Sequence, residues 1–151
     1  MNRYDILKLE NQICFPMYAA SREVIKRYHP YLKEINLTYT QYIAMLVFWE
    51  FGKISVRDLG EKLYLDSGTL TPLLKCLEEK GFIKRYRYPE DERVVIAEIT
   101  EKGEALKEQA VSIPEKVVEC IKMESEDAVQ LYHLLYKLLA ILDKKDSNHE
   151  R

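Results

Sequence analysis

Cysteine is the residue type in this chain with the most distinctive chemistry, and it occurs as Cys14, Cys76 and Cys120. Three cysteines cannot all pair within one chain, no CxxC spacing is present, and the three histidines lie far apart. We therefore expect thiols in a reducing compartment, with no metal site and no cofactor. A cysteine reacts through its thiolate, so the surroundings of each one decide whether it is reactive or inert.

Cys14 stands two residues before Pro16, in a stretch that is otherwise typical of an amphipathic helix. Helix interiors reject proline but the first position accepts it, so Pro16 predicts a helix that begins at about this point. Cys14 then lies at the helix N-terminus, where free N–H groups and the positive dipole end favour a thiolate. Apolar burial would oppose this, and hydrogen bonds from tyrosine hydroxyls would counteract the burial. The alternative is an inert cysteine packed as a small hydrophobe.

The composition excludes several classes of protein. With 151 residues, 47% of them hydrophobic and 32% charged, the chain is typical of one globular domain with a core. The longest apolar run, residues 43–49, is too short to cross a bilayer, and the N-terminus lacks the apolar core of a signal peptide. We therefore expect a cytoplasmic protein without a membrane partner. The net charge of −2 provides no global basic field, so a nucleic-acid surface would be local.

Helix signals dominate the middle of the sequence. Thr38 and Gln41 form a capping box before the apolar run, and Gly52 is placed to end that helix. Ser55 is placed to cap a short helix over residues 56–63. The next helix carries apolar residues at helical spacing and ends near Gly81, and it tolerates Pro72 only in its first two turns. Its apolar residues are Leu70, Leu73, Leu74 and Leu77.

Two segments after Gly81 are rich in β-branched and aromatic residues. Residues 82–88 and 93–99 are separated by Pro-Glu-Asp-Glu, which predicts a β-hairpin with a charged tip, and we expect this to be the only strand pair. Residues 80–88 contain four cationic side chains, three aromatic ones and no acidic one. The hairpin is therefore the candidate for a local nucleic-acid surface.

Helical arms flank this central region. Thr100 is placed to begin a helix, Ser112 and Glu115 form a further capping box, and residues 129–142 carry a broad leucine stripe. We predict a mainly α fold with a small β-hairpin wing, in a single domain over residues 1–151. A winged helix-turn-helix lobe spans 37–100, helical dimerisation arms span 1–36 and 101–145, and a tail spans 146–151. The stripe favours a partner subunit, and the alternative is an ordinary intrachain core.

The stretch LYLDSGTLTPLLKCLEEKGFIKR, followed by PEDERVVIAEIT, resembles the MarR family of dimeric winged-helix repressors. Together with LENQICF near the start, it is similar to the organic hydroperoxide resistance regulators of the two-cysteine type. The resemblance covers almost the whole chain. It implies a peroxide-sensing, DNA-binding transcriptional repressor that is a homodimer and not an enzyme. Its partners would be a pseudo-palindromic double-stranded DNA operator and, as the signal, organic hydroperoxides.

The resemblance also implies a role for individual residues. The recognition helix would meet DNA through Ser67, Gly68, Thr69, Thr71 and Lys75. The wing would meet DNA through Arg85, Arg87, Asp91 and Arg93, with Arg93 in the minor groove. The sensor would consist of Cys14 as the peroxide-sensing thiol, Tyr28 and Tyr39 as its hydrogen-bond donors, and Cys120 as the resolving thiol. Pro16 is unusual so soon after the sensor, and Cys76 has no role in the family pattern.

Tyr28 and Cys14 cannot meet within one straight helix. They are fourteen residues apart, which is about 21 Å along an α-helix. Contact requires a second, antiparallel copy of the helix and therefore a two-fold dimer. The sensor would then lie across the subunit interface, where oxidation would strain the contacts that set the spacing of the two recognition helices.

Three other hypotheses compete with this one. A repressor controlled by a small aromatic or phenolic ligand, bound between the arms and the winged helix, would make Cys14 incidental. A thiol peroxidase would consume peroxide, but the chain lacks the alternating strands and helices of a thioredoxin-type scaffold. A purely structural helical dimer would leave the DSGTLTP helix and the basic hairpin unexplained.

Overall fold

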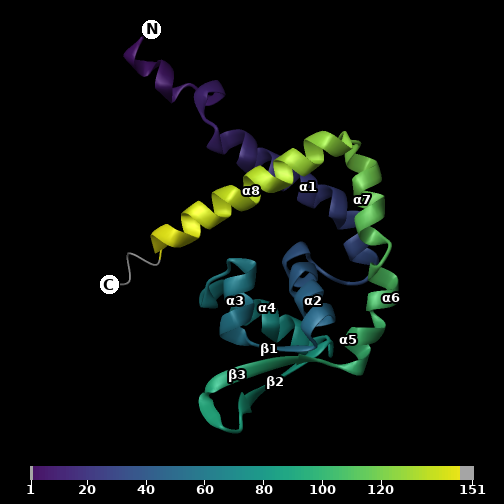
Figure 1. The fold of residues 1–151 in the computed structure, drawn as a ribbon. Coiled ribbons are helices and arrows are strands. Elements are labelled where there is room, and N and C mark those ends of the chain that lie inside the picture. Colours follow the sequence, from purple (N-terminus) through teal and green to yellow (C-terminus); the bar gives the residue numbers. More distant parts are fainter. Residues whose placement is uncertain (1, 147–151) are drawn as a thin grey trace. The chain divides into compact units, whose positions relative to one another are not determined.

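The computed structural model describes residues 2–146 and is mainly helical with one small antiparallel sheet (Figure 1). The elements in chain order are η1 (Arg3–Leu7), η2 (Leu9–Asn11), α1 (Cys14–Glu34), α2 (Tyr39–Phe51), β1 (Lys53–Ser55), α3 (Val56–Leu63), α4 (Ser67–Glu79), β2 (Ile83–Tyr88), β3 (Asp91–Ile99), α5 (Glu101–Ala105), α6 (Lys107–Ala110), α7 (Ile113–Ile121) and α8 (Ser125–Asp146). The predicted class, mainly α with a small wing, is confirmed.

Side-chain caps determine where α2 and α3 begin. The Thr38 hydroxyl accepts a hydrogen bond from the Gln41 backbone N–H at 3.3 Å, and the Gln41 side chain accepts one from the Thr38 N–H at 3.1 Å. The predicted capping box is therefore present, and α2 ends at Gly52, whose φ of 72° suits glycine. Ser55 caps α3 by accepting from the Asp58 N–H at 3.0 Å.

Helix α4 begins after Asp66, whose Oδ1 accepts a hydrogen bond from the Thr69 N–H at 2.7 Å. Pro72 lies in the second turn, and the sequence predicted that it would lie in one of the first two turns. The helix ends with Lys80 as its C-cap and Gly81 at a φ of 79°. The predicted apolar face is confirmed, since all four leucines of the stripe are buried.

The wing is a three-stranded sheet in the order β1-β3-β2, and the helices α3 and α4 lie above it in Figure 1. Strands β2 and β3 form the predicted hairpin, with Tyr88 paired to Asp91 across a tip of only two residues. The expectation of a single strand pair was wrong, because β1 adds to β3 through Ile54 opposite Ala97. A strand of three residues is too short to show the two-residue alternation that identifies a strand.

The core joins α2, α3, α4 and the sheet. Met45, Phe48, Leu59, Leu74 and Leu77 are each 0% exposed. They belong to one cluster of buried side chains that also includes residues of the loop after α1, of the sheet and of α6 and α7. Burial of these side chains is the main favourable contribution to folding of the lobe.

A second contact joins α2 to the start of α5. The Trp49 Nε1–H donates a hydrogen bond to the Gly103 carbonyl oxygen at 2.9 Å. Gly103 lies so close to the sheet that a Cβ atom there would stand 2.2 Å from the Phe82 carbonyl oxygen and 2.8 Å from Ile99 Cγ1. Glycine is the residue that this approach of two backbone segments requires.

The C-terminal part of the chain was predicted less completely. The helix expected after Thr100 is broken into α5 and α6, and α7 begins at Ile113 as the Ser112 signal predicted. Helix α8 begins before the predicted residue 129 and continues to Asp146, the first residue of the predicted tail. Of the predicted tail 146–151, all but Asp146 lies outside the described residues.

The chain divides into two compact units, residues 1–117 and 118–151. In the second unit, the leucine stripe of α8 is not a buried core. Leu131, Leu134 and Leu135 are 45%, 63% and 38% exposed. This exposure gives no support to the alternative of an ordinary intrachain core. The assignment of residues 1–36 and 101–145 as dimerisation arms stays a prediction.

Gly103→Ala should lower the free energy of unfolding by about 3 kcal/mol or more, at the upper end of overpacking costs, because the new Cβ would meet backbone atoms. Urea denaturation followed by circular dichroism measures the change. The control is Gly68→Ala, where a Cβ would stand 3.4 Å from the Asp66 Oδ1. The free energy of unfolding of that variant should fall by about 0.5 kcal/mol at most, or should rise slightly because alanine favours a helix over glycine. Equal effects of the two substitutions would contradict the close approach.

Candidate DNA interface and cysteine sensor

The predicted DNA-contacting residues of α4 lie on its exposed N-terminal turns. Ser67, Gly68, Thr69 and Thr71 are all exposed, and Lys75 follows one turn later on the exposed surface. The Asp66 cap fixes this end of the helix, and hydrogen bonds from Thr69 and then Gly68 lower the pKa of its carboxyl group. The arrangement presents small polar groups to solvent, which suits contact with base edges and phosphates.

The tip of the wing carries an arginine held by a carboxylate. Arg93 donates from Nε and Nη2 to the two oxygens of Asp91 at 3.0 and 3.1 Å, and its side chain is 90% exposed. This pairing lowers the pKa of Asp91 and raises that of Arg93. Asp91 therefore fixes the orientation of an arginine that remains available to an outside partner.

Arg85 and Arg87 occupy different positions from Arg93. Arg85 is half-buried, and it pairs with Glu78 of α4 through Nε at 3.2 Å and Nη2 at 3.4 Å. The pair lowers the pKa of Glu78 and joins the wing to α4. Arg87 donates to the Glu92 carbonyl oxygen at 3.0 Å across the hairpin. Arg85 thus supports the wing, whereas Arg87 remains exposed near its tip.

Cys14 is the first residue of α1 and is exposed. Its predicted place at a helix N-terminus is confirmed, and Pro16 is the third residue of the same helix. The residue before it, Ile13, offers no side-chain cap. The N-terminal N–H groups of α1 are therefore not satisfied by a capping side chain, which leaves their partial positive charge near the thiol.

Tyr28 and Tyr39 lie together, with ring centroids 5.0 Å apart in an edge-on arrangement. Helix α1 is continuous from Cys14 to Glu34. Tyr28 is therefore about 21 Å along the axis from the Cys14 of its own chain. The structure brings the two predicted tyrosines together and leaves the cysteine at the opposite end of α1.

A third tyrosine, Tyr42, completes this cluster and was missed in the sequence. Its ring centroid lies 5.7 Å from that of Tyr28 and 6.3 Å from that of Tyr39. The signal was present, because Tyr42 follows Tyr39 by three residues and so shares its helix face. Burial, followed by the neighbouring tyrosines, raises the pKa of Tyr42 to about 12. Burial likewise raises the pKa of Tyr28 and Tyr39, so these hydroxyls stay neutral donors at physiological pH.

The other two cysteines differ in exposure. Cys120 is exposed on the last turn of α7, and Cys76 is half-buried on α4.

Among residues 2–146, no group of His, Cys, Asp and Glu side chains is arranged to hold a metal ion. Within the same range, no helix is long and apolar enough to cross a bilayer.

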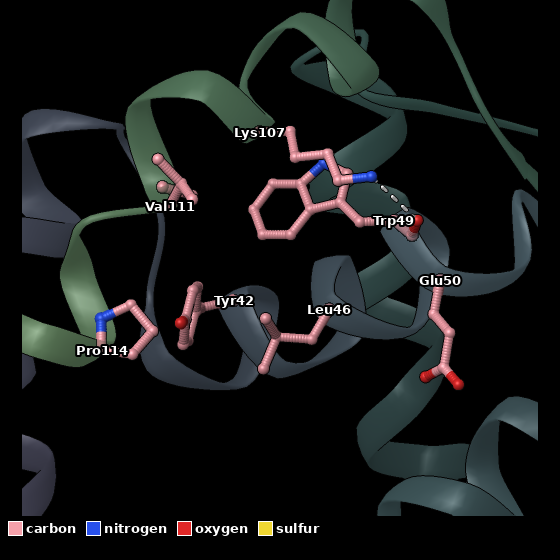
Figure 2. A pocket seen from close by; sticks show the side chains of 8 residues that line it. Tyr42, Leu46, Trp49, Glu50, Lys107, Val111 and Pro114 are labelled. Atoms are coloured by element: carbon pink, nitrogen blue, oxygen red, sulfur yellow. Dashed lines mark hydrogen bonds between the residues drawn. The ribbon is translucent and has the colours of Figure 1, made fainter.

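A pocket of about 380 Å³ adjoins the tyrosine cluster (Figure 2). Tyr42, Leu46 and Trp49 of α2 form one side of it, and Val111 and Pro114 face them from the segment around the start of α7. Lys107 lies at the rim and donates to the Trp49 carbonyl oxygen at 3.3 Å. Residue spacing along the sequence does not identify this lining, since it comes from segments about sixty residues apart.

Comparison with known proteins identifies the family. Residues 26–110 match the family described as transcriptional regulator SarA/Rot. An organic hydroperoxide resistance transcriptional regulator of Bacillus subtilis is 50% identical over 145 residues, which cover 96% of this chain and 99% of that protein. The chain belongs to the MarR family of winged-helix transcriptional regulators.

Solved structures of AbfR, a protein of Staphylococcus epidermidis, share the fold of this MarR-family chain. Reduced AbfR bound to DNA has a TM-score of 0.78 at 31% identity, over 95% of this chain and 98% of that one. Disulfide formed AbfR has a TM-score of 0.59 at 31% identity, over 94% of each chain. The predicted resemblance is confirmed, and this chain is a transcriptional regulator related to an organic hydroperoxide resistance regulator.

Tyr42→Phe should make the protein less sensitive to alkaline unfolding. An unfolded tyrosine titrates near pH 10, whereas the pKa of Tyr42 in the folded chain is about 12. As the pH rises, the unfolded state loses the Tyr42 proton first. The contribution of this hydroxyl to the free energy of unfolding is therefore full below about pH 10 and is lost as the pH rises through about 12. The free energy of unfolding, measured by urea denaturation across this range, should fall less steeply in the variant than in the wild type.

The control for loss of a hydroxyl is Tyr4→Phe, at a tyrosine that is 64% exposed. If the slopes of wild type and Tyr42→Phe coincide, burial of the Tyr42 hydroxyl does not contribute to alkaline unfolding.

Proposed function

We propose that this protein is a cytoplasmic, peroxide-sensing repressor that binds a pseudo-palindromic operator as a homodimer and releases it when Cys14 is oxidised. The observation that carries the proposal is the exposed thiol of Cys14 at the N-terminus of α1. It occurs in a chain that is 50% identical to an organic hydroperoxide resistance regulator. Organic hydroperoxides are the proposed signal.

The proposed dimer follows from the length of α1. Tyr28 and Tyr39 form one cluster, and the Cys14 of the same chain is about 21 Å away along the helix. The tyrosines can donate hydrogen bonds to a Cys14 only if a second chain supplies it in an antiparallel arrangement. The exposed leucine stripe of α8 supports the same assembly, because large exposed apolar faces mark interfaces.

The proposed chemistry uses two thiols. The Cys14 thiolate attacks the hydroperoxide, the O–O bond breaks, and a sulfenic acid and an alcohol are formed. The thiol of Cys120 from the other subunit then attacks the sulfenic sulfur, which forms a disulfide and releases water. The solved structure of disulfide formed AbfR, at 31% identity, supports such an end state. Cys76 takes no part in this scheme.

DNA would be held by the two recognition helices and the two wings of the dimer. The residues proposed to contact it are Ser67, Gly68, Thr69, Thr71, Lys75, Arg87 and Arg93, with Asp91 orienting Arg93 and Arg85 supporting the wing. Support comes from their exposure and from the likeness to reduced AbfR bound to DNA. The two half-sites would be centred about 34 Å apart, one turn of B-DNA.

A second candidate is a repressor controlled by a small aromatic ligand. The pocket formed by Tyr42, Trp49 and Val111, about 380 Å³ in volume, favours this hypothesis (Figure 2). Its size and mostly apolar lining suit a small ring compound. The two hypotheses differ in the role of Cys14, which is essential for the first and incidental for the second.

The first test treats the protein with cumene hydroperoxide and measures its affinity for a DNA duplex that it has selected from a random pool. Oxidation should weaken binding by about 100-fold, within the range typical of coupled sites. Cys14→Ser should bind DNA when reduced and should not release it with peroxide. Release from Cys14→Ser equal to that from the wild type would contradict the proposal.

The remaining cysteines serve as matched controls in the same experiment. Non-reducing electrophoresis after peroxide treatment should show a covalent dimer that Cys120→Ser abolishes and Cys76→Ser retains. A covalent link mapped between Cys14 and Cys76, or a wild-type chain that stays entirely monomeric on the gel, would contradict the disulfide.

Arg93→Ala should weaken DNA binding by about ten- to a hundredfold, as expected for loss of an arginine that contacts DNA. Fluorescence anisotropy of the selected duplex measures the affinity. Glu92→Ala, at the neighbouring wing residue of opposite charge, is the control and should bind at least as tightly as the wild type. If both variants lose affinity equally, the effect arises from distortion of the hairpin and not from an arginine contact.

A further inference from the structure

A single ammonium group joins the end of the recognition helix to the loop between α1 and α2. Lys80, the C-cap of α4, donates from Nζ to the Asn36 carbonyl oxygen at 2.7 Å and to the Gln41 Oε1 at 2.9 Å. Its partners lie about forty residues earlier in the chain. Hydrogen bonds from a charged donor are shorter and stronger than neutral ones, so this contact holds two distant segments in register.

The two acceptors are themselves fixed in position. Asn36 has a φ of 57°, the left-handed conformation that turns the chain out of α1. Gln41 is only 7% exposed, and its Oε1 also accepts the Thr38 N–H at 3.1 Å in the capping box of α2. Lys80 therefore bonds to the turn that ends α1 and to the cap that begins α2.

This loop carries the tyrosine cluster at its edge. Tyr39 is the first residue of α2, directly after Thr38, and its ring lies 5.0 Å from that of Tyr28 on α1. A change in the spacing of these two rings would move the loop that Lys80 holds. If the contact of Lys80 with this loop has two discrete arrangements, a change at a site on α1 can shift the position of α4.

We propose that Lys80 is a positioning residue that couples oxidation of Cys14 to the recognition helix. In the reduced protein its hydrogen bonds hold α4 in the arrangement that binds DNA. Oxidation changes the contacts of Tyr28 and Tyr39, which shifts the loop, and Lys80 carries the shift to α4. This inference rests on the proposed function, and it adds a residue that touches neither the thiol nor the proposed DNA contacts.

Lys102 provides a matched comparison. Its Nζ donates to the Lys80 carbonyl oxygen at 2.8 Å, so a second ammonium holds the same end of α4. It does so from the start of α5. Loss of Lys80 removes a charge and two hydrogen bonds at this helix end, and loss of Lys102 removes a charge and one hydrogen bond there. Only loss of Lys80 disconnects the loop between α1 and α2.

The experiment compares Lys80→Met, Lys80→Arg and Lys102→Met with the wild type. For each protein, the affinity for the selected duplex is measured before and after cumene hydroperoxide, and the rate of Cys14 oxidation is followed by mass spectrometry. The quantity of interest is the dissociation constant of the oxidised protein divided by that of the reduced protein. This ratio reports the coupling between Cys14 and the DNA-binding surface. A structural role alone would lower thermal stability and leave this ratio unchanged.

Lys80→Met should oxidise at Cys14 within about twofold of the wild-type rate, while its ratio falls by about tenfold or more, a change of the size that such couplings show. Lys80→Arg should retain most of the ratio, and Lys102→Met should retain all of it. If Lys80→Met does not fold, Lys80→Gln, which keeps a neutral N–H donor on a shorter stem, should show a reduced ratio instead.

The outcomes separate the two proposals. A wild-type ratio in the folded Lys80 variant, or an equal fall in Lys102→Met, overturns the coupling role and leaves the proposed function intact. A wild-type protein that keeps its DNA after Cys14 is oxidised overturns the proposed function, and the coupling role with it.

Discussion

The burial of one face of α4 against α2 and the sheet is the interaction on which the functional geometry depends. Leu74 and Leu77 of α4 are completely buried, together with Met45 and Phe48 of α2. Because one face of α4 is fixed in this way, its other face is fixed too, and its polar first turns point to solvent. The same packing sets the place of Lys80, so both the proposed DNA contact and its proposed control depend on one apolar interface.

The sequence predicted the parts of this fold that depend on local chemistry. Capping residues such as Thr38 and Ser55 satisfy N–H groups within three residues, so their effect is readable from spacing alone. The same holds for the leucine face of α4 and for Cys14 at the start of α1. These signals need no knowledge of distant segments, and the structure confirms each of them.

Features that depend on contacts between distant segments were not predictable. Strand β1 exists because Ile54 meets Ala97 on β3, and the break between α5 and α6 follows no proline or capping residue. The pocket beside Tyr42 and the bonds of Lys80 each combine segments about forty to sixty residues apart. The sensor roles of Cys14, Tyr28 and Tyr39 stay predictions. The separation of Cys14 from Tyr28 within one chain was predictable, because it depends only on the fourteen residues between them in one continuous helix.

The position of β2 at the edge of the sheet has a consequence for solubility. An edge strand leaves backbone N–H and C=O groups open to pairing with another chain, and charged side chains and bulges discourage such pairing. Strand β2 carries Lys84, Arg85 and Arg87, and the register shifts between Arg87 and Tyr88. The cations that suit this hairpin to a polyanion therefore also protect the sheet from self-association. Selection against aggregation would preserve positive charge on β2 even in a descendant that had lost its DNA target.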